Sequence, residues 1–350
     1  MATPTGAERK LLAAGAKKGS VWGTAVAVGA LNGLNVKNIT GFVRNQDLLA
    51  AQEVDSPMPR WGQLDVIKPP EPVIITDMLY DSGQLGSLIV GLWGTAGAPA
   101  QQGGTAAYLH TIQFKDSNAG IFFTMVVEHP GKIYELASAK TMEWSLKSSG
   151  GGIIQSELKL RGDVIIDTSA TNAAAQVDAL TYQDRSNRML FRHQVVKMND
   201  QSGADVSGAT ALDCNSVEIT IKRTGFDSLY PAGQYGIVEP IEPGYPDIRV
   251  KLGFPRFNSV NAAFFATAIA ETLQKMTITF TGPLIAGAYY YQKKFYFPQL
   301  RMLNPDTQWE EIVKNGLELV AEEASANPTG MSYARPYMEW INKQTTDYLA

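Results

Sequence analysis

The sequence predicts a mainly β protein, and three features point that way. Turn-forming residues are plentiful, with 32 Gly and 18 Pro. Hydrophobic residues make up 45% of the chain, whereas only 18% of residues are charged. Short runs of alternating apolar and polar residues recur between turns, as expected for strands with one buried face. We therefore predict a β-sandwich or barrel-like fold with one flanking α-helix and extended loops.

The first quarter of the chain predicts an arm, two strands, a loop and a helix. Residues 1–20 are small and polar and predict a flexible N-terminal arm, after which one β-sandwich domain spans residues 21–350. Val21–Gly29 and Val36–Val43 read as strands. Asp55–Pro72 holds five prolines, which lack the N–H that a central strand donates, and predicts a long loop. Apolar spacing over Thr76–Leu92 predicts the flanking helix, ended by Gly91 and Gly94.

Most of the remaining chain predicts strands. A second helix is expected at Ala262–Lys275, and a late alternating segment covers Asp306–Glu323. The other strand predictions are Thr111–Lys115, Ile121–His129, Ile133–Leu146, Ile153–Ile166, Met189–Lys197, Val217–Lys222, Ile248–Leu252, Met276–Phe280, Tyr289–Phe297, Leu300–Leu303 and Met338–Ile341.

Charge and cysteine content limit the classes of function. The net charge is −4 without a basic stripe, so the sequence does not predict tight binding of duplex DNA. Mild acidity suits a surface past which nucleic acid slides, but it is also the commonest state of soluble bacterial proteins. The single Cys214 cannot form an internal disulfide. The basic N-terminus is not a signal peptide, and the apolar stretch Ala262–Ala270 is too short to span a bilayer. We expect synthesis in the cytoplasm and no membrane partner.

No residue set in the sequence predicts catalysis, a cofactor or a metal. The histidines His110, His129 and His193 lack a second ligand at metal-site spacing, and Cys214 lies in a polar stretch. Gly150–Gly152 lies between two predicted strands, where a hairpin turn explains it. Adjacent carboxylates at 310–311 and 322–323 would point to opposite faces of a strand. We therefore predict a protein that is not an enzyme.

A dense aromatic cluster at Tyr289–Phe297 surrounds Lys293 and Lys294. Two interpretations stay open: a strand with one face in the core, or a contact surface between subunits, where Tyr and Phe are enriched. Stacking on nucleic acid is less favoured, because two lysines make a poor electrostatic groove.

Several segments together resemble the major tail tube proteins of long-tailed bacteriophages. The opening Trp22-Gly23-Thr24 is similar to the aromatic-Gly-Thr that often begins such chains. A Pro-rich loop precedes a helix that ends in LIVGLWG, as in that family. The pair Tyr134–Leu146 and Ile153–Val164 resembles the family's central strands, and Leu317–Met331 resembles its late strand and loop. The weakly patterned residues 167–215 and 225–246 read as outward insertions.

The resemblance implies a structural virion protein of the phage tail. Subunits would form hexameric rings that stack into a tube, through which DNA passes into the host without specific binding. The partners implied are other copies of the chain, with ring-to-ring contacts through residues 1–20 and 44–72, and the tail terminator, tape-measure and baseplate or tip proteins. The alternatives are a capsid or decoration protein, or a carbohydrate-binding adhesion β-sandwich with an exposed aromatic platform.

Overall fold

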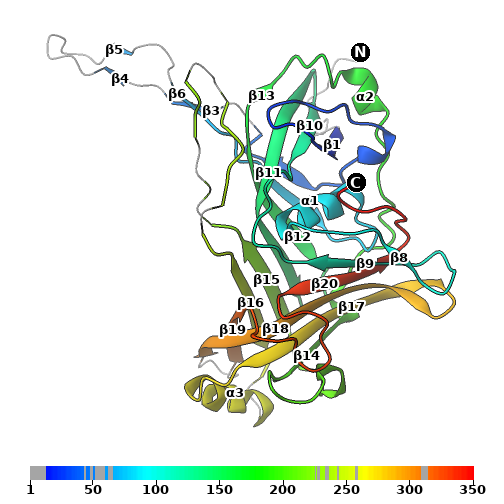
Figure 1. Cartoon of the computed structure of the whole chain (residues 1–350), viewed down its shortest axis with the longest axis vertical. Helices are drawn as coiled ribbons and strands as arrows, with labels where there is room; N and C mark the ends of the chain where they lie inside the picture. The colour runs from blue at the N-terminus through cyan, green and yellow to red at the C-terminus, as the bar shows by residue number, and fades with distance from the viewer. Residues whose placement is uncertain are drawn as a thin grey trace.

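The structure is a computed structural model that describes residues 13–42, 45–47, 50–51, 60–61, 66–224, 226, 229–232, 236–242, 244–256, 259–308 and 314–350. It is mainly β, as predicted, and dominated by one large antiparallel sheet (Figure 1). The strands of this sheet are β1 (Ala13–Lys18), β2 (Asn38–Thr40), β7 (Val73–Asp77), β8 (Ala100–Gln101), β9 (Tyr108–Gln113), β10 (Phe123–His129), β11 (Lys132–Ser149), β12 (Gln155–Gly162), β13 (Ile165–Ile166), β14 (Gln194–Asp200), β15 (Ser216–Lys222), β16 (Asp247–Phe254), β17 (Gln274–Ala286), β18 (Tyr289–Gln308), β19 (Lys314–Glu322) and β20 (Tyr337–Asn342).

The main sheet runs in the order β2-β7-β12-β11-β15-β16-β19-β18-β20-β9-β8. Two long strands, β11 and β18, each change partners along their length. The first half of β11 pairs with β10 and its second half with β15, with a register shift at Thr141/Glu143 in the pairing with β12. The strand β18 pairs with β20 near its start and with β19 near its end, while β17 lies along its other edge. Bulges of this kind bend a strand and let one sheet curl around a core.

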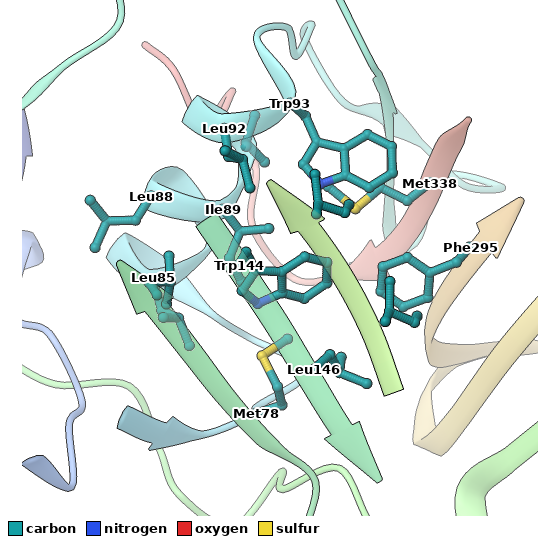
Figure 2. Close-up of a cluster of buried hydrophobic side chains, with 14 of the residues drawn as sticks. Met78, Leu85, Leu88, Ile89, Leu92, Trp93, Trp144, Leu146, Phe295 and Met338 are labelled. Atoms are coloured by element: carbon teal, nitrogen blue, oxygen red, sulfur yellow. The ribbon is translucent and has the colours of Figure 1, made fainter. Parts of the chain in front are cut away.

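Helix α1 (Gly83–Trp93) lies in the space that the curled sheet encloses. Figure 2 shows its apolar residues above Trp144 of β11 and Phe295 of β18, whose rings are 5.8 Å apart. Glycine lets the helix approach the sheet closely, since a Cβ at Gly91 would lie 2.7 Å from the Phe123 ring. The helix ends at Gly94, one of the two predicted stop residues, which has the left-handed conformation (φ 87°), whereas Gly91 lies within the helix.

The predicted start of this helix is wrong. Its first residues form β7, which pairs with both β2 and β12. The β-branched run Val73–Thr76 suits a strand buried between two neighbours, and this pairing outweighs the helical spacing of the apolar residues. The described residues include two further α-helices, α2 (Ala174–Asp178) and α3 (Ser259–Ile269), and the latter overlaps the second predicted helix.

The N-terminal predictions also need correction. Residues 1–12 lie outside the described residues, and Ala13–Lys18 forms β1 in the sheet rather than part of an arm. Its small side chains pack closely, with Ala14 and Ala16 buried. No strand forms at Val21–Gly29, because side chains capture its backbone N–H groups: Ser138 Oγ accepts from Gly23 and Thr124 Oγ1 from Val26.

The region expected to be a long loop contains paired strands in its described parts. The strand β3 (Asn45–Asp47) pairs with β6 (Val66–Lys68), and β4 (Ala50–Ala51) pairs with β5 (Arg60–Trp61). Each pair forms a separate two-stranded sheet. We call these two pairs the ribbon; Figure 1 shows β4 and β5 well away from the main sheet. Residues 55–59 and 62–65 of the predicted loop lie outside the described residues.

The two segments predicted as outward insertions contact the body where they are described. Within 167–215, β14 pairs with β17 over its full length, and Met189 and Val196 are buried. Residues 236–242 bond to the side chains of Lys140, Asp163 and Arg223. Whether either segment is an insertion relative to other proteins stays a prediction.

Candidate assembly surfaces and buried charges

The residues considered for chemistry take structural places. His110 is buried in β9, where its Nε2 lies 3.0 Å from the Gln344 carbonyl and burial lowers its pKa. His193 contacts Tyr80, His129 packs against Tyr134, and burial raises the pKa of Cys214 to about 12. Within the described ranges, no group of three His, Cys, Asp or Glu side chains is arranged to hold a metal ion.

The aromatic cluster belongs mostly to the core. Tyr291, Phe295 and Phe297 are buried, and Tyr296 stacks on Tyr337 with ring centroids 4.2 Å apart. Tyr290 is about half exposed. Of the two sequence interpretations, the core accounts for most of these residues, and Tyr290 alone is a large exposed aromatic of this cluster.

A buried lysine lies at the N-terminal end of α1. Lys293 is fully buried on β18, donates to the Ser82 Oγ that precedes the helix, and lies 3.8 Å above the Trp340 ring. Burial lowers its pKa to about 7, although the negative charge of Asp81 opposes this shift. Its position could have been suspected, because Lys293 shares its strand face with the core residues Tyr291 and Phe295.

A second buried cation lies at the C-terminal end of α1. Arg223, with no exposed side-chain area, donates to the carbonyl oxygens of Leu92 (2.6 Å) and Lys115 (2.7 Å). It also forms an ion pair with the buried carboxylate of Glu242. Arg223 thereby satisfies the carbonyl of Leu92, in the last turn of the helix, where carbonyls lack intrahelical partners. Sequence reasoning missed this residue, because its partners are more than 15 residues away.

Glu242 belongs to a segment that we call the strap, residues 229–232, 236–242 and 244–245. Two further bonds fix the strap to the sheet: Glu239 accepts from the buried Lys140 Nζ at 2.6 Å, and Asp163 Oδ1 accepts from the Ile237 N–H at 2.9 Å. The strap connects β15 to β16, whose ends are already paired at Lys222 and Asp247. A two-residue turn could join those ends, so the sheet does not require the strap.

Large apolar side chains are concentrated on the exposed side of the strap. Those with high exposure are Leu229, Tyr230, Val238, Ile241 and Tyr245. Ile241 is 67% exposed and lies in the sequence between Glu239 and Glu242, which form ion pairs with the buried Lys140 and Arg223. Grouped exposure of this kind marks an interaction surface more often than scattered single residues do.

A second projecting surface, the tip, consists of residues 100–107 and 281–292. The ends of β17 and β18 form its hairpin, and Gly103 approaches the Tyr289 ring, since a Cβ there would lie 3.1 Å from it. Leu284 and Tyr290 are about half exposed. Pro283 and two register shifts interrupt the ladder, which discourages another chain from extending this edge by strand pairing.

No protein-family model and no curated protein matches this chain. Among the described residues, no helix is both long enough and apolar enough to cross a membrane. The strap, the tip and the ribbon are therefore the candidate functional surfaces of the protein.

Proposed function

We propose that this chain is a structural subunit that assembles into stacked rings, forming a phage tail tube through which DNA passes. The observation that carries the proposal is the ribbon. Its two strand pairs are separate from the main sheet among the described residues. An isolated two-stranded ribbon is marginally stable in water and gains stability by packing against another surface. A neighbouring copy in a polymer offers such a surface.

A stacked tube also needs defined contacts, partners and a place of action. Residues 1–12 and 44–72 make the ring-to-ring contacts, since Ala13–Lys18 is already paired within the sheet. The tail terminator, tape-measure and baseplate or tail-tip proteins bind the ends and lumen of the tube. The site of action is the virion tail. The net charge of −4 fits a lumen past which DNA slides without sticking. Two contacts of different kinds are needed: one closes the ring, and the other repeats along the axis.

Deleting residues 52–69 tests the role of the ribbon. We expect the full-length protein at high concentration to form tubes visible by negative-stain electron microscopy. The shortened chain should stay folded, with a cooperative thermal unfolding transition, but should not stack, because the axial contact has been removed. Normal tubes from the shortened chain would contradict this assignment, and a wild-type protein that forms no tubes would contradict the proposed function.

A further inference from the structure

The tip is free of charged side chains. Neither residues 94–114 nor residues 276–292 contain Asp, Glu, Lys or Arg, although 18% of the whole chain is charged. Both stretches supply the tip, one through β8 and the turn that follows it and the other through the β17–β18 hairpin. Charged residues are depleted in the buried centres of protein interfaces, because desolvating a charge is costly. The tip therefore has the composition of an interface centre.

The strap also presents an uncharged outer side. Residues 229–245 contain two ionisable acids, Glu239 and Glu242, and no Lys or Arg. Both acids bond inward, to Lys140 and Arg223. Ion pairs that are this well buried contribute little net stability, but they hold one geometry. The part of the strap that carries Val238 and Ile241 is thus held in place before any partner arrives, which lowers the entropy cost of binding.

The strap and the tip lie on opposite sides of the molecule. In Figure 1 the strap is the yellow-green segment at the left, and the tip is the orange hairpin with the cyan turn at the right. Two different patches on opposite sides cannot meet within one copy. They can meet between copies in a head-to-tail arrangement, which closes into a ring when the rotation per subunit allows.

We propose that the tip of one copy docks on the strap of the next copy, with Leu284 and Tyr290 against Val238 and Ile241. We take the partner to be a second copy because each copy carries both surfaces, and the exposed side chains of the tip and of the strap are alike apolar and uncharged. A charged partner would lose its hydration against either surface without gaining an ion pair. This inference rests on the proposed function, in which it supplies the contact within a ring.

Complementary charges introduced on the two surfaces test the contact. Leu284→Glu places a carboxylate on the tip, and Ile241→Lys places an ammonium on the strap. Both side chains are more than half exposed, at 52% and 67%, so the fold tolerates the changes. Each variant alone should associate about 30-fold more weakly, as at the centre of an interface. The matched control is Leu31→Glu, at a site 79% exposed and outside both surfaces, which should leave association unchanged.

Mixing the two variants distinguishes contact between copies from a local effect. In an equimolar mixture the copies can alternate, so that Glu-bearing tips meet Lys-bearing straps and unchanged tips meet unchanged straps. Sedimentation velocity should then show assembly restored. Single variants that assemble like the wild type, or a mixture that does not recover, would overturn the tip-to-strap contact.

Electron microscopy of the same samples separates this inference from the proposed function. If the mixture restores rings but no sample contains tubes, the tip-to-strap contact is upheld and the proposed tube function is contradicted. If the wild type and both single variants all form tubes, the tube function is upheld and the tip-to-strap contact is contradicted.

Discussion

A buried cation lies at each end of helix α1, but the two cations have different partners. Arg223 at the C-terminal end has the carboxylate of Glu242 and several carbonyl oxygens as partners. Lys293 at the N-terminal end has a hydroxyl group and an aromatic ring. The helix dipole favours a cation at its C-terminus and disfavours one at its N-terminus. Arginine cannot release its proton and needs compensation, whereas lysine can become neutral.

The two buried cations differ in how they respond to pH. Burial lowers the pKa of Lys293 to about 7, so this side chain exchanges its proton near neutrality. The Arg223 end keeps its charge and depends on the strap for the matching carboxylate. Protonation of Lys293 thus changes the charge at the N-terminal end of α1. At the C-terminal end, the strap supplies the Glu242 carboxylate that balances Arg223.

Removing the compensated cation should have the largest effect. Arg223→Met leaves the Glu242 carboxylate buried without its partner and the end of α1 without a donor. We expect a loss of about 3–5 kcal/mol in the free energy of unfolding, measured by urea denaturation. The double variant Arg223→Met/Glu242→Leu should recover most of it, because both charges are then gone. Equal losses in the single and double variants would show that the ion pair is not the cause.

Removing the other cation should change the pH dependence of stability. The folded pKa of Lys293 is about 7, below the ordinary value of 10.5, so the unfolded chain binds more protons between these two values. Its contribution therefore makes stability rise with pH across this window, by up to about 1.4 kcal/mol per pH unit. Lys293→Met should be more stable than the wild type at pH 7, and the difference should shrink as the pH rises to 9.

The exposed Lys222 at the end of β15 provides the control for this experiment. Lys222→Met should follow the wild type in urea denaturation at every pH from 7 to 9. If Lys293→Met and the wild type also run parallel over that range, proton release from Lys293 does not determine the slope.

The smallest effect should come from the hydroxyl group beside Lys293. Ser82→Ala removes the hydroxyl oxygen that accepts from the Lys293 ammonium. It also removes the hydrogen bond that the Ser82 hydroxyl donates to the Leu79 carbonyl oxygen, 2.8 Å away. The expected loss is about 1 kcal/mol at pH 7, falling by pH 9 as Lys293 becomes neutral. Thermal unfolding at the two pH values measures it. A loss that grows with pH would place the role of Ser82 elsewhere.

Local pattern predicted those strands whose alternation agrees with their pairing. Val217–Lys222 alternates clearly and coincides closely with β15, and the end of α1 follows from Gly94. The failures occur where distant residues decide the conformation. The run at Val73–Asp77 becomes a strand because β2 and β12 lie on both sides of it. Residues Val21–Gly29 stay irregular because hydroxyl and amide side chains over 90 residues away accept from their backbone.

The sequence by itself determined the mainly β class, the turns, and the absence of a recognisable catalytic or metal motif, because these depend on composition and local spacing. Only the tertiary structure showed that Lys140, Arg223 and Lys293 are buried, since a charged residue is buried only where distant partners compensate it or its pKa shifts. It also placed the strap and the tip on opposite sides of the molecule. That arrangement depends on how the sheet curls, which no local pattern encodes.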